Sequence, residues 1–424
     1  MGREYRVGEW RPYTIWQFRQ GHHQEMSSHA LPGADETKLR IIPPTLALAV
    51  VVAGFVTFLN MWCTQAILPI LATSLHVPEV ATGATVTAPL VATAVIAPVI
   101  GMLSDRFGRR VFVRGASLLL VIPTVLAAFS TSLGMLVACR FAQGLLLPFI
   151  FTITIAYISD EMVPAMAMRM VGIYSSGAIG GGFAGRLVSG LATSAWNWRV
   201  AFLAVALLTL ASALVITFYL PKERCFKPIY GISGALRSFP NHLSNLPLMT
   251  TYAVGFGLLF SLVSVFTFIN FRLALPPYDL GPAALGLIFV VYLGGIVVAP
   301  IMGRLMASID RRWLMLGCVA MSVLGLALTL AAPLSVICLG LLLLCLGVFP
   351  QQTLTTGVIG VVARGAKSTA VGLYVTFYYV GGSFGGFAPA VVWHDAGWAG
   401  CVAMAITVQL IMLGLVWFAW RVVR

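Results

Sequence analysis

The chain has 424 residues, of which 59% are hydrophobic and only 9% are charged. Soluble domains contain about 45–50% hydrophobic and about 25% charged residues, so this composition excludes a water-soluble protein and predicts several membrane spans. The formal net charge is +13. The basic residues lie in short segments between apolar runs, which excludes the single basic face of a nucleic-acid-binding domain.

Residues 1–43 are polar and lack the apolar core and cleavage site of a signal peptide, so we expect a cytoplasmic tail. From residue 45 onward, runs of about 20 apolar residues recur, the length that crosses a hydrocarbon core of roughly 30 Å. The predicted spans are 45–71, 80–102, 111–130, 133–155, 168–192, 197–220, 247–271, 281–303, 313–331, 334–356, 368–392 and 398–420. We predict an all-α membrane protein with twelve transmembrane helices, in bundles at 44–220 and 247–424 joined by a cytoplasmic linker at 221–246.

The segment 101–114, GMLSDRFGRRVFVR, concentrates charge between the second and third spans and is predicted to be a loop at the membrane surface. Glycine at position 108 permits a tight turn there. The region recurs 202 residues later without a gap, with identical residues at Ala97, Pro98, Gly101, Leu103, Arg109, Arg110 and Gly115. This duplication predicts two parallel six-helix repeats, an architecture in which transporters bind their substrates between the repeats.

Orientation follows from the basic residues, because cytoplasmic loops retain Lys and Arg. With both termini in the cytoplasm, 22 of the 26 basic residues fall on the cytoplasmic side. The exceptions are Arg140, Arg186, Arg199 and Arg272.

Polar residues within the spans are candidates for a substrate or proton pathway, because such groups are costly in lipid. Arg140 and Gln143 lie in the fourth span, where a cation is retained mainly when it faces a cavity or a partner. Each candidate lines a cavity or bridges two helices, and the other candidates are Asn60, Gln65, Asn270, Gln351 and Gln352.

In the fifth span, Gly177, Gly181 and Gly185 recur every four residues. This spacing favours close helix packing.

The motif Gly-x-Leu-x-Asp-Arg-x-Gly-Arg-Arg is matched in full, and in it the chain resembles the major facilitator superfamily. The matching residues are Gly101, Leu103, Asp105, Arg106, Gly108, Arg109 and Arg110. In that superfamily the aspartate faces the start of the eleventh span, here Ser368 and Thr369, and joins the halves when the cytoplasmic side closes. The resemblance therefore implies a gating motif, with a simple topology anchor as the alternative. It also implies that spans 1, 4, 7 and 10, which carry the seven polar candidates, line the cavity.

Two further segments extend the resemblance. The fourth span, LVACRFAQGLLLP, is similar to the family's Arg-x-x-Gln-Gly motif, and GAIGGGFAGR resembles the antiporter motif Gly-x-x-x-Gly-Pro-x-x-Gly-Gly. The second match departs where proline would be Gly182 and the last glycine Arg186. From about residue 45 the chain resembles the YnfM-like, acriflavine-sensitivity branch, through AYISDEMVP at 156–164 and WNWRVAF at 196–202.

This resemblance implies a secondary active transporter, not an enzyme, that exports a small amphiphilic drug or metabolite by alternating access in exchange for protons. The alternatives are a passive facilitator or importer of a small polar solute and a sensor without flux. We expect a monomer, multi-pass in the bacterial inner membrane, with no cofactor, metal or nucleic acid. Acidic residues lie in the tail, in loops and at span ends, whereas Arg140 lies within a span. We therefore predict a positive cavity and a neutral or anionic, amphiphilic substrate. Arg140 either contacts this substrate or responds to the proton gradient through a loop acid such as Asp160 or Glu161.

Overall fold

A computed structural model describes residues 41–224, 244–295, 302, 305–306, 308–362 and 367–422, with the side chains of 101–107, 367–369 and 422 excepted. The predicted tail, most of the linker and part of the second motif copy lie outside these residues. So do the side chains of Asp105, Ser368 and Thr369, on which the predicted gate depends.

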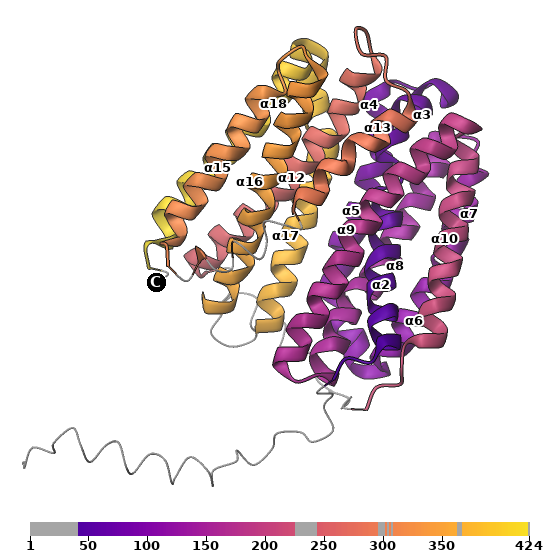
Figure 1. Cartoon of the computed structure of the whole chain (residues 1–424), viewed down its shortest axis with the longest axis vertical. Coiled ribbons are helices and arrows are strands. Elements are labelled where there is room, and N and C mark those ends of the chain that lie inside the picture. The colour runs from indigo at the N-terminus through magenta and orange to yellow at the C-terminus, as the bar shows by residue number, and fades with distance from the viewer. Residues whose placement is uncertain are drawn as a thin grey trace, which may run out of the picture. The chain divides into compact units, whose positions relative to one another are not determined.

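The first half of the bundle consists of helices from α2 to α10 (Figure 1). They are α2 (Pro44–Trp62), η1 (Gln65–Ile67), α3 (Leu68–Leu75), α4 (Glu79–Thr82), α5 (Ala84–Phe107), α6 (Arg109–Leu119), α7 (Val121–Ala128), α8 (Leu133–Glu161), α9 (Pro164–Ala195) and α10 (Trp198–Tyr219). Side-chain caps fix where several helices begin. The Ser132 hydroxyl accepts a hydrogen bond from the Met135 N–H at the start of α8. The Asn197 side chain accepts from two N–H groups at the start of α10.

The second half repeats this pattern. It contains α12 (Leu246–Ala274), α13 (Pro282–Ile288), η2 (Phe289–Leu293), α15 (Arg311–Leu328), α16 (Leu334–Val362), α17 (Lys367–Phe387), α18 (Pro389–Ala419) and η3 (Trp420–Val422). Helix α18 is interrupted at Gly397, whose φ of 55° is in the left-handed region that glycine adopts easily. This interruption lies in the predicted turn between the last two spans.

The described residues contain nine stretches long and apolar enough to cross a membrane, and each coincides with a predicted span. Two further predicted spans correspond to α9, of 32 residues, and α17, of 21 residues. The remaining one, 281–303, falls on the shorter apolar segment Pro282–Leu293 and on residues outside the description.

The predicted surface loop at 101–114 is wrong in its extent. Helix α5 continues to Phe107 and α6 begins at Arg109, so Gly108 alone separates them. Gly108 has φ 96°, and a Cβ atom built there would lie 2.5 Å from Glu223 Oε1. The motif is therefore a one-residue corner between two helices, and glycine is required at its centre.

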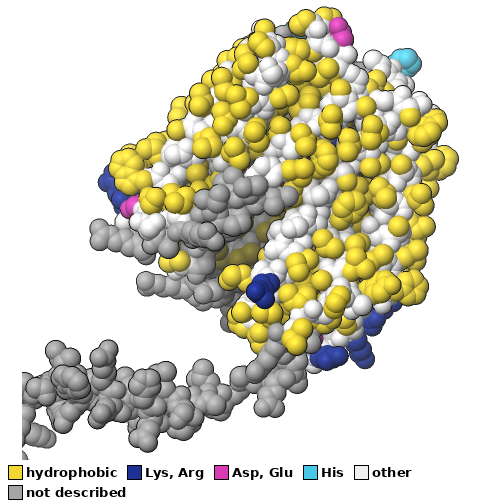
Figure 2. Space-filling view, viewed as in Figure 1, with side chains coloured by type: hydrophobic (Ala, Val, Ile, Leu, Met, Phe, Trp, Pro, Cys, Tyr) yellow, Lys and Arg dark blue, Asp and Glu magenta, His cyan; other side chains and the backbone are white. Residues whose placement is uncertain are grey.

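The helices run between two ends of the bundle. We call the end with Gly108, Glu161 and Pro221 the Gly108 end, and the end with His76, Trp196 and Leu275 the His76 end. The face seen in Figure 2 is largely hydrophobic, with a few Lys and Arg side chains at its left edge and in its lower part. Leu207, Phe218 and Phe418 are 68–76% exposed, as expected of side chains that face lipid.

The two halves pack their first and fifth spans in the same way. Three glycines of α9 face the backbone of α2: Cβ atoms built at Gly177, Gly181 and Gly185 would clash with the carbonyl oxygens of Val51, Phe55 and Leu59. In the second half, Gly381 and Gly385 of α17 face Phe256 and Phe260 of α12 in the same manner. The glycines thus let two long helices approach at backbone distance.

Candidate functional site

Arg140 is fully buried in α8, and its guanidinium donates to three carbonyl groups of neighbouring helices. Nε lies 3.0 Å from Thr85 O, Nη1 2.6 Å from Asn60 O, and Nη2 2.7 Å from Met61 O. Nη1 also donates to Gln143 Oε1. Asn60 and Met61 are the last turn of α2 before the chain breaks ahead of η1, so the cation compensates the free carbonyls at that helix end.

Amide and hydroxyl side chains extend this cluster across the first half. Gln143 Nε2 lies 2.8 Å from Thr124 Oγ1, which donates to Asn60 Oδ1 at 3.0 Å. Asn60 Nδ2 reaches Thr209 Oγ1 at 2.8 Å. All of these contacts lie within the first half. In this structure the Arg140 side chain bonds to the carbonyls at the break in α2 and bridges helices, and its contact with a substrate stays a prediction.

A second polar cluster joins the two halves at the η1 segment. Gln65 is fully buried, and its Nε2 lies 3.1 Å from Thr267 Oγ1 of α12. Asn270 Nδ2, also on α12, lies 3.0 Å from Gln65 O. Two of the predicted pathway residues thus meet between the halves.

Arg186 completes this second cluster from α9. Its Nε and Nη2 lie 2.9 and 2.7 Å from Gln65 Oε1, and Nη1 lies 2.9 Å from Gly182 O. The guanidinium carbon lies 4.9 Å from the ring centroid of Trp62, 4.3 Å from Phe289 and 4.6 Å from Tyr292. The side chain is 1% exposed. We call these partners, Gln65, Gly182, Trp62, Phe289 and Tyr292, the Arg186 box.

Sequence reasoning treated Arg186 only as a departure from the antiporter motif and as an exception to the charge rule. The sequence did contain a signal for a role of Arg186, because a cation in the interior of a span is retained mainly when it faces a cavity or a partner. That argument selected Arg140 and applies equally to Arg186. Two of the three aromatic partners, Phe289 and Tyr292, come from η2 in the other half, so the sequence alone does not pair them with α9.

The predicted residues of the tenth span, Gln351 and Gln352, lie outside both polar clusters. Gln351 is buried, and its Nε2 lies 3.0 Å from Ser322 Oγ of α15, so it bridges two helices of the second half. Its Oε1 has no hydrogen-bond partner among the described residues. Gln352 is half-buried on the same helix. The structure does not bring either residue into the Arg186 box.

Aromatic side chains continue the contact between the halves. The ring centroids of Phe151 on α8 and Tyr379 on α17 lie 5.8 Å apart, and Phe58 on α2 lies 6.5 Å from Phe151. Tyr378 lies 5.6 Å from Tyr379 in an edge-on arrangement. The interface thus combines aromatic surface with the polar groups of the Arg186 box.

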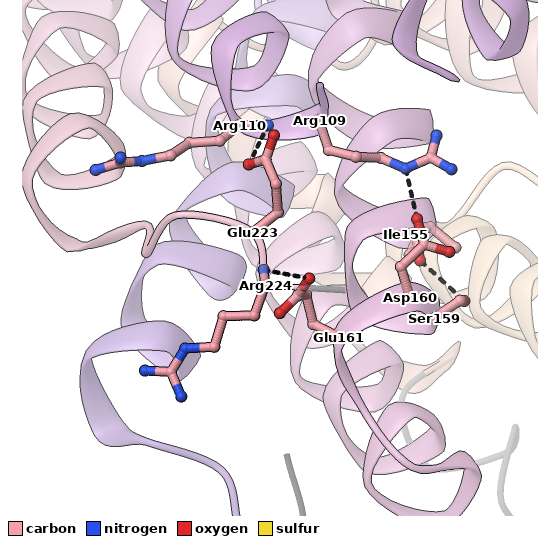
Figure 3. A network of polar contacts seen from close by, with 8 residues as sticks. All are labelled: Arg109, Arg110, Ile155, Ser159, Asp160, Glu161, Glu223 and Arg224. Carbon is pink, nitrogen blue, oxygen red and sulfur yellow. Dashed lines mark hydrogen bonds and ion pairs between the residues drawn. The ribbon is translucent and has the colours of Figure 1, made fainter. Parts of the chain in front are cut away.

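Charged groups at the Gly108 end form a separate network around the one-residue corner (Figure 3). Arg109 Nε lies 2.7 Å from Asp160 Oδ2 at the end of α8. The Arg110 N–H lies 3.3 Å from Glu223 Oε2, and the Arg224 N–H lies 2.8 Å from Glu161 Oε1. This network ties the motif to α8 and to the first linker residues.

At the His76 end the two halves are in direct contact. The Ala283 N–H of α13 lies 3.0 Å from Ser194 Oγ of α9, and a Cβ atom built at Gly190 would clash with Pro282 O. On the other side, Thr87 of α5 lies against Ser383 and Gly386 of α17. Both contacts must separate before this end of the interface can open.

The sequence profile of the Major Facilitator Superfamily matches residues 50–386. The chain belongs to this superfamily. It is therefore a membrane transporter rather than an enzyme, and it has the superfamily's twelve-helix all-α fold. A small-molecule substrate and the lipid bilayer are the partners that this membership implies.

Individual relatives agree with this assignment. The inner membrane transport protein YnfM of Escherichia coli is 33% identical over 369 residues, covering 87% of this chain and 88% of YnfM. An uncharacterized transporter of Buchnera aphidicola is 29% identical over 86% of this chain and 89% of its own. The nucleoside transporter NupG superposes with a TM-score of 0.73 at 12% identity, over 89% of this chain and all of NupG. That likeness concerns the fold alone.

Proposed function

We propose that this protein is a secondary active transporter that exports a small amphiphilic molecule, a drug or metabolite, in exchange for protons by alternating access. The observation that carries the proposal is the interface between the halves. It presents an amide and a guanidinium group at Gln65 and Arg186 beside the rings of Trp62 and Tyr292. An amphiphile needs both kinds of surface, a largely apolar wall and a few placed polar groups.

Export and proton exchange are supported by the partial match of the fifth span to the antiporter motif. In this proposal residues 44–220 and 247–424 rock against each other, and Asp105 contacts the start of α17 when the Gly108 end closes. The network of Figure 3 supports this role, because it fixes the helix corner that carries the motif.

We further propose a bacterial inner-membrane location, with both termini and the Gly108 end in the cytoplasm, and a monomeric protein. The distribution of arginine supports this orientation. Of the four basic residues that departed from the rule, Arg140 and Arg186 are buried inside the bundle. Only Arg199 and Arg272 remain at the His76 end, so the asymmetry is stronger than the sequence indicated.

Purified protein in liposomes tests the proposal. A radiolabelled panel of amphiphilic drugs and metabolites is assayed for flux with an imposed pH gradient, with the gradient collapsed by a protonophore, and in liposomes without protein. We expect accumulation that needs both the protein and the gradient. Flux that ignores the gradient would identify a passive facilitator, and the absence of flux across the panel would contradict transport of this class.

A further inference from the structure

We propose that Arg186 binds the acidic group of the transported molecule, so that the substrate is an amphiphile bearing a carboxylate or a comparable anion. This inference rests on the proposed transport function and specifies its ligand. Arg186 is 1% exposed. No carboxylate in the described part of the chain forms an ion pair with it, although a buried cation ordinarily requires a counter-charge.

The hydrogen bonds of Arg186 leave capacity for an anion. A guanidinium has five N–H groups. The Arg186 box accepts from Nε, from Nη2 and from Nη1, each once. One N–H on each terminal nitrogen therefore has no acceptor among the described residues, and two such groups form the fork that grips a carboxylate bidentately.

Half-buried aromatic rings and a glycine adjoin the guanidinium. Trp62 and Tyr292 are half-buried, although the guanidinium between them is not exposed. Position 182 is glycine, and a Cβ atom built there would lie 3.5 Å from Arg186 Nη1 and 3.5 Å from Trp62 Cδ1. A methyl group would thus fit beside Arg186 Nη1 and Trp62 at ordinary contact distances. This space is smaller than a carboxylate, so binding of the anion needs a separation of the halves.

The box is divided between the halves, and this division suggests how the substrate anion and the second-half rings exchange at the cation. Gln65, Gly182 and Trp62 belong to the first half with Arg186, whereas Phe289 and Tyr292 belong to η2 of the second half. Separation of the halves at the His76 end removes the two second-half rings from the cation. A substrate anion then replaces them, so the anion and the second-half rings are alternative partners of one guanidinium.

The second repeat does not contain an equivalent site. At the repeat spacing of 200 that relates Val171 to Val371, position 186 corresponds to Gly386. A Cβ atom at Gly386 would clash with Thr87 Oγ1. The contact between α5 and α17 is therefore close and uncharged, and the proposal predicts one anion per protein.

The first test measures binding to the purified full-length protein in detergent by isothermal titration calorimetry at pH 7.5. The probes are ω-phenylalkanoates with two to ten carbons in the chain, each compared with its uncharged amide. We expect the best acid to bind the wild type at least tenfold more tightly than its amide. Arg186→Gln should abolish this difference, and Arg186→Lys should reduce it, because an ammonium group lacks the planar fork.

The matched control is Arg199→Gln. Arg199 also stacks on an aromatic ring, 4.2 Å from Trp198, and donates to a carbonyl, Ser130 O, but it lies outside the interface. This variant should retain the preference for the acid. Binding of no acid by the wild type, or equal preference in the wild type and Arg186→Gln, would overturn the proposal.

A second test keeps Arg186 intact, so it does not depend on whether its variants fold. Cysteines replace Ser194 and Ala283, which are in contact across the halves, and a short bifunctional thiol reagent links them. The best acid should reduce the cross-linking rate at least threefold, whereas its amide should not. An unchanged rate at saturating acid would overturn the exchange of partners. A flux assay that ignores the pH gradient while this acid effect persists would instead contradict only the proton-coupled export.

Discussion

Two arginines are buried in this bundle, and their charges are compensated by different groups. Arg140 is surrounded by carbonyl oxygens at the break in α2, whereas Arg186 has three aromatic faces and the amide of Gln65. Carbonyls at a helix end are fixed by the backbone, so Arg140 is suited to a permanent contact. Aromatic contacts are worth about 0.5–2 kcal/mol each, so those of Arg186 can be exchanged during a transport cycle.

We predict that Arg140→Gln destabilises the protein. Thr85 O and Met61 O would lose the Arg140 donor, while Asn60 O would keep only the Cys63 thiol. Each unsatisfied buried group costs about 1–3 kcal/mol, so the free energy of unfolding should fall by about 2 kcal/mol or more. Thermal unfolding in detergent measures this, with Arg199→Gln as the control. An unchanged melting temperature, combined with weakened substrate binding, would contradict this structural role and favour the predicted substrate contact of Arg140.

Among the elements, the contact between α2 and α9 depends on glycine at successive turns of α9. We predict that Gly181→Ala lowers the free energy of unfolding by about 1–3 kcal/mol, because its Cβ would clash with Phe55 O. The adjacent Gly180 is a matched control, since nothing lies within 4 Å of a Cβ there. Gly180→Ala should be neutral or stabilising by up to about 1 kcal/mol. Equal melting temperatures for the two variants would contradict the backbone contact.

The Gly108 corner gives a second prediction at this scale. Gly108→Ala places a Cβ in a left-handed conformation and 2.5 Å from Glu223 Oε1. We expect at least a threefold lower transport rate with the protein still inserted in the membrane. Gly115→Ala, on the neighbouring helix α6 with nothing within 4 Å of its Cβ, should transport normally. Normal flux in both variants would reduce the corner to a topology anchor.

Much of the element pattern could be predicted from the sequence, because a span needs only length and hydrophobicity. The helical extent of 101–107 could not, since a charged segment is equally suited to a loop and to the end of a helix. Gln65 and Asn270 were identified as polar groups in spans, but their contact crosses 205 residues. The Arg186 box was missed for the same reason. In the sequence, Phe289 and Tyr292 are ordinary residues of an apolar span, and their contact with Arg186 is evident only in the folded structure.

At the scale of the whole molecule, the charges mark the two ends. We predict that a cysteine at Lys222 resists an impermeant thiol reagent added outside intact cells, whereas one at His394 reacts. His394 is 94% exposed at the His76 end. Both cysteine variants are made in a protein in which serine replaces Cys225 and Cys338. The other native cysteines are buried and can remain. Labelling at Lys222 and protection at His394 would invert the proposed orientation.

The depth of Arg186 also has an electrical consequence. The residue lies nine positions before the end of α9, about 14 Å along the helix axis, so it carries positive charge well within the thickness of a bilayer. An elementary charge that crosses the full membrane potential changes energy by about 2.3 kcal/mol per 100 mV. If water reaches Arg186 from alternate sides, each reorientation of the empty protein moves part of this charge through the field. We therefore expect the empty carrier to be voltage-sensitive, and an anion bound at Arg186 to cancel that sensitivity.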